Sequence, residues 1–405
     1  MSGARQRWLS LVGIGEDGLD GLSPAARGLL AQAELVVGGA RHLALAGPLG
    51  CETLKWPSPM TEALPEILAR RGRPVVVLAS GDPFFYGVGT LIARHVAPDE
   101  IRCAPQPSSF SLAAARLGWS LQDCALVSVH GRALERLVPH LRPGARILAL
   151  SWDGETPRRA AKLLTARGMG ASRLVALESL GGPHENLREA RACDWADTQV
   201  DPLNVMAIEP VMDGRARIVP RASGLPDDLF EHDGQITRRD VRAITLSALA
   251  PEGAETLWDI GAGSGSVAIE WMLCDPRNSA IAIETNAVRA ARIGRNAREL
   301  GTPDLQIVAG HAPEALAGLS QPDAIFIGGG ATAPGAMDAA MAALRPGGRL
   351  VVNAVTIETQ ALLAQLHVAH GGALVSIQIA QAEPIGRYFG FRPAMPVVQW
   401  RWRKP

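Results

Sequence analysis

The sequence predicts an α/β protein with two domains, each built on a mostly parallel sheet. Short apolar runs alternate with amphipathic stretches along the chain, a pattern typical of strands joined by helices. The chain has 405 residues, which is more than one hydrophobic core usually holds. A stretch rich in Pro, Gly and Asp interrupts the alternation near the middle. We therefore expect a first domain at residues 1–212, a connection at 213–234 and a second domain at 235–405.

In the first half, strands are expected where apolar and β-branched residues run together, and helices where apolar residues recur at helical spacing. Ser23 before Pro24 is a helix start, because the serine hydroxyl caps the first turn and proline suits its first position. The expected strands are 9–14, 35–37, 75–79, 126–129, 147–150, 174–177 and 205–208, and the expected helices include 24–33 and 158–166.

The second half begins a new series of strands and helices. Thr237 is placed to cap a helix that runs to Leu249, with Asp240 as a weak capping box. The expected strands are 256–260, 280–283, 306–308, 324–327, 349–353, 374–379 and 397–402.

The composition excludes several classes of protein. The formal net charge is zero, which gives no sign of the basic surface that a nucleic-acid partner requires. The five cysteines are scattered and form no C-x-x-C pair, so neither disulfides nor a metal site are expected. No apolar run is long enough to cross a bilayer, so we expect no membrane association and a cytoplasmic location.

A glycine-rich turn joins an expected strand to an expected helix in the second half. Such a turn lets a ligand approach the backbone, and the helix that follows presents N–H groups to it. The turn departs from the dinucleotide pattern, because Ser266 stands where the third glycine would be. A turn without ligand and an NAD site are the alternatives. The residues of the turn are Gly261, Ala262, Gly263, Ser264 and Gly265.

The G-x-G-x-G spacing, with Asp259 before it, resembles the first motif of class I methyltransferases. Their cofactor is S-adenosylmethionine, so the resemblance implies that the turn binds it. Glu284 ends the next expected strand, where an acidic side chain holds ribose hydroxyls and disfavours a 2′-phosphate.

The first half resembles the tetrapyrrole methylase family. The resemblance rests on VGIGEDGLDGLSPAARGLL, LASGDPFFYGVG, PSSFSLAAARLGW, SVHGR and ESLGGPHENL. It implies a fold of two α/β subdomains with S-adenosylmethionine between them. Glu16 and Asp17 replace the Pro-Gly that usually follows the opening glycines. The implied cofactor contacts are Gly81, Asp82, Pro83, Ser108 and Ser109.

The second half resembles the decarboxylating corrin methyltransferases, through GQITRRDVRAITLSAL, WDIGAGSGSVAIEW and RPAMPVVQW. It implies a class I Rossmann-like domain in which Thr237 and Ala312 approach the cofactor. Joined in this order, the halves imply an enzyme of cobalamin biosynthesis. It would methylate a precorrin at carbons 5 and 15, release CO2 from the ring C acetate, and assemble as a homo-oligomer through the C-terminal domain.

The acid that protonates the product is less well defined by the sequence. His232 and Asp233 are candidates from position alone, and Arg238 is a candidate for binding substrate carboxylates. The alternative for Arg238 and its neighbours Arg239 and Arg242 is a solvated helix face. Two other functions stay open at this point: an RNA methyltransferase, and a non-catalytic S-adenosylmethionine sensor.

Overall fold

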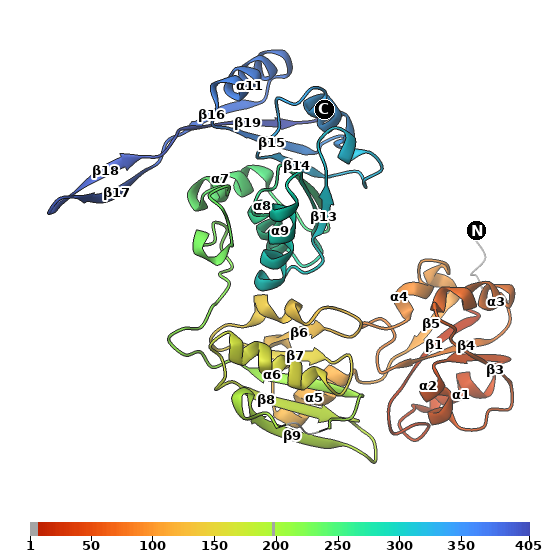
Figure 1. The fold of residues 1–405 in the computed structure, drawn as a ribbon. Coiled ribbons are helices and arrows are strands. Elements are labelled where there is room, and N and C mark those ends of the chain that lie inside the picture. Colours follow the sequence, from red (N-terminus) through yellow and green to blue (C-terminus); the bar gives the residue numbers. More distant parts are fainter. Residues whose placement is uncertain (1–6, 197–198) are drawn as a thin grey trace. The chain divides into compact units, whose positions relative to one another are not determined.

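The computed structural model describes residues 7–196 and 199–405. These form two compact units, each an α/β domain, in agreement with the predicted fold class (Figure 1). The first unit comprises the chain to Leu134 together with Arg142–Arg217, and the second comprises Glu135–Leu141 and Ile218–Pro405.

The first unit begins with a five-stranded sheet in which every strand pairing is parallel. Its strand order is β3-β2-β4-β1-β5, so β1 and β4 lie near the centre; β1 is buried throughout, and β4 is buried up to its last residue, Ser80. The strands are β1 (Leu9–Ile14), β2 (Leu35–Gly38), β3 (Glu52–Lys55), β4 (Val75–Ser80) and β5 (Ile101–Ala104); the helices are α1 (Pro24–Ala31), α2 (Ala40–Ala46), α3 (Leu64–Ala69) and α4 (Gly89–Ile92).

A second, mixed sheet completes this unit in the order β6-β7-β10-β8-β9. Only β6 and β7 are parallel, and the other pairings are antiparallel. The strands are β6 (Cys124–Ser128), β7 (Arg146–Leu150), β8 (Arg173–Glu178), β9 (Asn186–Arg191) and β10 (Asn204–Glu209); the helices are α5 (Ser109–Leu117) and α6 (Thr156–Ala166).

The strands predicted for the first half are all present, and the predicted start of α1 is confirmed. Ser23 Oγ accepts a hydrogen bond from the Ala26 amide at 3.2 Å. Three strands were missed by sequence reasoning, namely β3, β5 and β9. They lie at sheet edges and carry exposed polar side chains, so the run of apolar residues that marks a buried strand is absent.

The second unit holds a seven-stranded sheet in the order β13-β12-β11-β14-β15-β19-β16. All pairings are parallel except those of β19, which runs against both of its neighbours. The chain moves one way from β11 to β12 and β13 and the other way to β14, and such a switch point is where open sheets bind ligands. The strands are β11 (Thr256–Ile260), β12 (Ser279–Glu284), β13 (Gln306–Ala309), β14 (Ala324–Ile327), β15 (Arg349–Ala354), β16 (Ala373–Ile377) and β19 (Val397–Arg403).

Helices cover this sheet, and their apolar faces form its core with Trp258, Trp271 and Trp400. All seven strands predicted for the second half are present within one or two residues of their expected bounds. The helices are α7 (Arg239–Leu249), α8 (Ser266–Cys274), α9 (Ala287–Leu300), α10 (Ala336–Ala343) and α11 (Ile357–His370).

A two-stranded hairpin, β17 (Ala380–Ile385) and β18 (Tyr388–Pro393), extends from the seven-stranded sheet as a long arm (Figure 1). It was not predicted from the sequence. Large apolar side chains on this arm face solvent, which a monomeric soluble protein rarely allows on one segment. The most exposed are Ile385, Tyr388, Phe389 and Phe391, each with 64% to 79% of its surface accessible.

The start of α7 corrects a sequence prediction. Thr237 does not cap the helix, which begins at Arg239 without a side-chain cap. Instead the Thr237 carbonyl accepts a hydrogen bond from the guanidinium of Arg242. Arg242 is fully buried, not part of a solvated face, and its Nε lies 2.5 Å from Glu270 Oε1 on α8.

The partners of this buried ion pair come from the segment before α7. Glu270 accepts hydrogen bonds from the amides of Gly224 and Leu225, at 2.6 and 2.9 Å. Arg242 also donates to the Leu225 carbonyl and to Asp227. The pair therefore ties much of the segment expected as a connection, 213–234, to the helices of the second unit.

Among the residues that the structure describes, none of the helices is both long and apolar enough to span a membrane.

Glu270→Gln should destabilise the second unit by about 3–5 kcal/mol, because it leaves the buried Arg242 charge without its main partner. Pulse proteolysis of the full-length protein across a denaturant series, with fragments assigned by mass spectrometry, measures this loss. Glu314→Gln, at an exposed position, is the control. The double variant Arg242→Met/Glu270→Leu should recover much of the stability. An equal loss in Glu270→Gln and in the double variant would contradict a role for the pair.

Candidate functional site

A large cavity in the second unit opens at the carboxyl edge of the sheet. Its volume is about 1260 Å³, above the ordinary range for a single small-molecule site. The glycine turn after β11, the end of β12, the loop after β14, the end of β15 and the base of the hairpin all contribute to its wall. The site residues predicted from the sequence that line it are Thr237, Arg238, Gly261, Ala262, Gly263, Glu284 and Ala312.

The glycines of this turn are required by close backbone contacts. Gly261 has a φ of +70°, and a Cβ there would lie 2.8 Å from the Gly329 amide nitrogen. Gly263 has a φ of +60°, and a Cβ there would lie 3.0 Å from the Gln235 carbonyl oxygen. Two glycine segments and the segment before α7 thus meet at the cavity wall, with backbone in place of side chains.

Ser264 and Gly265 are in the same turn but do not line the cavity. Ser264 is fully buried, and its carbonyl accepts a hydrogen bond from Asn296 at 2.9 Å. A Cβ on Gly265 would approach Ile293 of α9 to 2.7 Å. These two residues therefore shape the turn from behind and hold it against α9.

Two carboxylates stand beside the turn. Glu284 Oε2 accepts from the Gly263 amide at 2.8 Å, and Glu284 Oε1 accepts from the Asn286 amide at 2.9 Å. Asp259 is buried, and its Oδ2 accepts from the Ala268 amide at 3.1 Å, whereas its Oδ1 has no hydrogen-bond partner among residues 7–196 and 199–405. The pKa of Asp259 is raised to about 7, chiefly by burial; the Ala268 hydrogen bond partly opposes this shift, and the nearby charge of Glu284 contributes to it.

His232 and Asp233 are not among the residues that line the cavity. Asp233 Oδ2 lies 3.0 Å from Arg289 Nε and 3.1 Å from Arg292 Nη1. Hydrogen bonds from these arginines hold the pKa of Asp233 far below its usual range. Asp233 is thus paired with two arginines outside the cavity wall, and its role as a proton donor stays a prediction. His232 Nδ1 accepts from the Gly234 amide at 3.1 Å.

In the first unit, the structure brings the predicted cofactor residues together in the loops that follow β4 and β5. Gly81 has a φ of +53°, and a Cβ there would lie 3.0 Å from Ser108 Cα. Ser108 caps α5 by accepting from the Ser111 amide at 3.2 Å, and Ser109 is the first residue of that helix. Asp82 and Pro83 continue the loop from Gly81, where Asp82 Oδ1 accepts from the Phe84 amide at 2.9 Å.

Sequence reasoning missed a polar cluster beside this loop. Arg41 of α2 forms an ion pair with Glu16 and donates to Ser80 Oγ at 2.7 Å. His42 Nε2 lies 2.9 Å from the same hydroxyl. Burial, with the Arg41 charge, lowers the pKa of His42 to about 4, so this imidazole is neutral at neutral pH. The sequence offered one signal of this cluster. Glu16 stands where the family usually has proline, and its carboxylate is the partner of Arg41.

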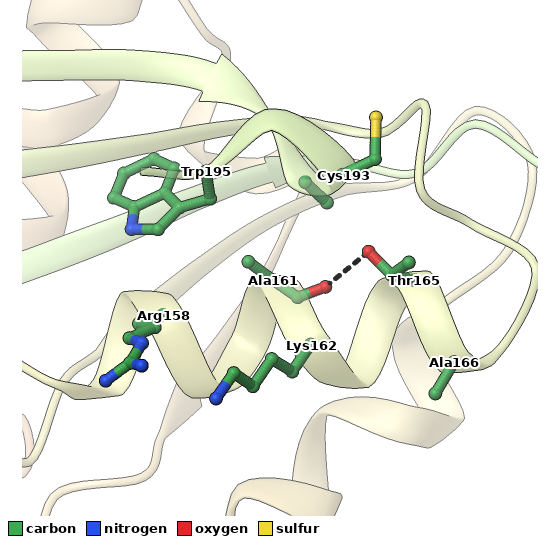
Figure 2. A pocket seen from close by; sticks show the side chains of 8 residues that line it. Arg158, Ala161, Lys162, Thr165, Ala166, Cys193 and Trp195 are labelled. Atoms are coloured by element: carbon green, nitrogen blue, oxygen red, sulfur yellow. Dashed lines mark hydrogen bonds between the residues drawn. The ribbon is translucent and has the colours of Figure 1, made fainter. Parts of the chain in front are cut away.

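A second, smaller cavity of about 540 Å³ lies in the first unit, between α6 and the residues 192–195. Figure 2 shows Arg158 and Lys162 on the helix, with Trp195 and Cys193 on the opposite wall. Its lining includes none of the predicted cofactor residues. Among the described residues, no three His, Cys, Asp or Glu side chains are grouped as a metal site requires.

The raised pKa of Asp259 predicts a pH-dependent difference in stability between the protein and its Asp259→Asn variant. A raised pKa in the fold means that the stability from this group is present below pH 4 and is lost as the pH rises through 7. Asparagine keeps the site neutral at every pH. The free energy of unfolding of the variant should therefore rise relative to that of the parent protein as the pH rises from about 4 to 7, by up to about 4 kcal/mol.

Pulse proteolysis of the second unit at pH 5 and pH 7.5 measures this difference. Asp338→Asn, at an exposed position on α10, controls for the general effect of removing a carboxylate. A constant offset between the parent and the Asp259→Asn variant at the two pH values would show that Asp259 ionises normally.

Known proteins match the chain in both halves. Residues 9–194 match the family of tetrapyrrole (corrin/porphyrin) methylases, and residues 228–404 match the precorrin methyltransferase domain. A precorrin-6Y C(5,15)-methyltransferase (decarboxylating) from Sinorhizobium sp is 58% identical over 398 residues, which are 98% of this chain and 96% of that protein.

Two shorter relatives from Salmonella typhimurium each match less than half of the chain. A cobalt-precorrin-7 C(5)-methyltransferase is 36% identical over 182 residues, 44% of this chain and 88% of its own length. A cobalt-precorrin-6B C(15)-methyltransferase (decarboxylating) is 35% identical over 180 residues, 43% of this chain and 92% of its own length. By its match along nearly the whole length of the Sinorhizobium protein, the chain belongs to the family of precorrin-6Y C(5,15)-methyltransferases (decarboxylating).

Proposed function

We propose that this chain methylates a precorrin at carbons 5 and 15 and releases the ring C acetate carboxyl as CO2, in cobalamin biosynthesis. The observation that carries the proposal is that each unit has a glycine-lined loop of the predicted kind at the carboxyl edge of a parallel sheet. Membership of the family supports the same reaction. The first unit would methylate carbon 5, and the second would methylate carbon 15 and release CO2.

The large cavity of the second unit fits S-adenosylmethionine as the methyl donor. Gly261 and Gly263 leave a wall without side chains, as the approach of a nucleoside to backbone requires. Glu284 stands at the end of β12 with lone pairs available to accept from ribose hydroxyls. Thr237 and Ala312 line the same cavity. In the first unit, Gly81, Asp82, Pro83, Ser108 and Ser109 would form the corresponding site.

When bound, S-adenosylmethionine supplies an electrophilic methyl group. Electron-rich carbons of a reduced macrocycle need no serine, cysteine or metal to activate them, so the task of the protein is to orient and to exclude water. Arg238 and Arg239 line the cavity and carry the charge that a substrate rich in carboxylates requires. The volume of the cavity leaves room for part of the macrocycle beside the donor.

A cytoplasmic location belongs to this proposal, in keeping with the five free cysteines. A macrocycle substrate, in place of RNA, stays a prediction. Incubating the protein with labelled S-adenosylmethionine and either reduced precorrin or RNA tests it. Transfer to RNA without transfer to precorrin would refute the proposal, and donor binding without transfer to either would indicate a sensor.

Two matched glycine variants test the division of labour between the units. Gly263→Leu should lower the rates of carbon 15 methylation and of CO2 release at least a hundredfold. The leucine side chain would fill the space through which the donor approaches and would collide with Gln235. Gly81→Leu should abolish methylation at carbon 5 in the same way, because of its contact with Pro107 and Ser108. Product analysis by NMR with 13C-methyl donor measures both methylations.

Each variant is the control for the other, because the site in the opposite unit is left intact. Titration calorimetry with S-adenosylhomocysteine should give two sites in the parent protein and one in each variant. Carbon 15 methylation by Gly263→Leu would contradict the assignment of the turn, and a single site in the parent protein would reduce the enzyme to one donor site.

We also propose that the protein is a homo-oligomer held together through the hairpin of the second unit. An isolated two-stranded sheet is marginally stable in water, and this one exposes Phe389 and Phe391 by 76% and 79%. A second copy of the same arm would cover these rings and pair with the open strand edges.

The double variant Phe389→Glu/Phe391→Glu should therefore shift the protein to monomers, because charged side chains oppose burial of the arm. Light scattering coupled to size-exclusion chromatography measures the mass. Val368→Glu on α11, at a position that is 86% exposed, is the matched control and should leave the mass unchanged. A parent protein that is already monomeric would contradict the proposal.

A further inference from the structure

A chain of polar side chains connected by hydrogen bonds lies beside the cavity of the second unit, between β15, β19 and α7. Asn353 near the end of β15 lies directly opposite Gln399 of β19. Gln399 and Thr245 of α7 are both fully buried, whereas Asn353 is half-buried and lines the cavity. Nothing in the donor site described above uses these groups.

The hydrogen bonds fix the orientation of each amide in turn. Arg401 Nε lies 2.7 Å from Gln399 Oε1, and because a guanidinium only donates, the oxygen of Gln399 must face it. The Gln399 amide nitrogen therefore faces the other way. It donates to Asn353 Oδ1 at 2.8 Å and to Thr245 Oγ1 at 3.1 Å.

Thr245 completes the constraint. Its single hydroxyl proton is spent on the Val241 carbonyl at 2.8 Å, so its oxygen can only accept from other partners. Asn353 Nδ2 lies 3.0 Å from that oxygen and must donate to it. Asn353 is thus held by two partners in one orientation, with one N–H and one lone pair not used by any hydrogen bond within the described chain.

The position of Asn353 in the sheet separates it from the methyl donor. Glu284 ends β12 on one side of β11, whereas β15 lies two strands away on the other side. Strands are spaced by about 4.8 Å, so the ends of β12 and β15 are roughly 14 Å apart. Asn353 therefore faces the part of the cavity that is left for the second substrate.

We propose that Asn353 donates its remaining N–H to a carboxylate of the macrocycle, and that Thr245 and Gln399 are positioning residues that aim this N–H. The inference rests on the proposed function. A neutral donor suits a carboxylate that must leave, because an arginine would stabilise the bound anion more strongly than the transition state, in which that charge moves away.

In that step the bond between the methylene carbon and the carboxyl carbon breaks, and CO2 departs. The electron pair of the bond passes into the conjugated macrocycle, and a proton from water later completes the methyl group. Asn353 forms no bond and takes no proton; it holds the carboxyl group in one orientation until the bond breaks.

The test uses the full-length enzyme with S-adenosylmethionine and the reduced precorrin, and follows CO2 release, carbon 15 methylation and carbon 5 methylation. Asn353→Ala and the isosteric Thr245→Val should each slow CO2 release about tenfold to a hundredfold, as expected for a lost hydrogen bond to a charged group. Thr245→Ser keeps the hydroxyl and should restore the parent rate. Carbon 5 methylation should be unchanged in all three.

The kinetic constants distinguish the two sources of a carboxylate. A fall in kcat for CO2 release identifies the departing acetate, and a rise in KM for the precorrin alone identifies another carboxylate of the macrocycle; either result supports the proposal. Values of kcat for CO2 release and of KM for the precorrin that both stay within twofold of the parent in Asn353→Ala and Thr245→Val would overturn it. So would weaker S-adenosylhomocysteine binding with an unchanged KM for the precorrin, because Asn353 would then belong to the donor site.

Failure of this inference is distinct from failure of the proposed function. A parent enzyme that releases no CO2 from the precorrin contradicts the function itself, whereas an active parent with unaffected variants contradicts only the role of Asn353. Gln365→Ala, an exposed position on α11, controls for nonspecific loss of activity, and the melting temperatures of all variants check folding.

Discussion

The buried guanidinium of Arg242 is the interaction on which the second unit's site depends. A charge with no exposed surface is stable only when its hydrogen bonds are satisfied, and Arg242 meets this condition through Glu270, Asp227 and the carbonyls of Leu225 and Thr237. Two of these partners are backbone groups of the segment that enters the domain. The cation therefore sets the path of that segment, and with it the wall of the cavity that Thr237 and Arg238 form.

Both units bring two loops unusually close together, although their folds differ. At the carboxyl edge of each sheet, one loop must approach another more closely than any side chain permits. Gly261 lies against Gly329 in the second unit, and Gly81 lies against Pro107 and Ser108 in the first. Each of these glycines also has a positive φ, so the conformation and the close approach both select glycine. Glycine loses more conformational entropy on folding than other residues, but at these positions it gives a ligand access to the backbone.

The elements that could be predicted from the sequence are those that depend on residues close together in the chain. Apolar runs such as Val75–Ser80 mark a strand because its burial needs no knowledge of its partners. The glycine turn after β11 was recognisable from its spacing alone. What could not be predicted depends on distant partners. Arg242 looks like its neighbours on an exposed helix face until Glu270 and Asp227 are brought to it, and Thr237 gives its carbonyl to that arginine instead of capping α7. Asn353 gains significance only when Gln399 lies opposite it.

The hairpin carries both an exposed apolar surface and part of the cavity wall. Phe389 and Phe391 lie on one face of its ladder, whereas Glu383 and Arg392, which line the cavity and pair at 3.1 Å, lie on the other face. The two faces belong to one continuous ladder, in which Ala380–Ile385 pair with Tyr388–Pro393. In the proposed homo-oligomer, residues that contact the second copy would therefore alternate along the same two strands with residues of the cavity wall, so that self-association and substrate fit would constrain one short segment of the sequence.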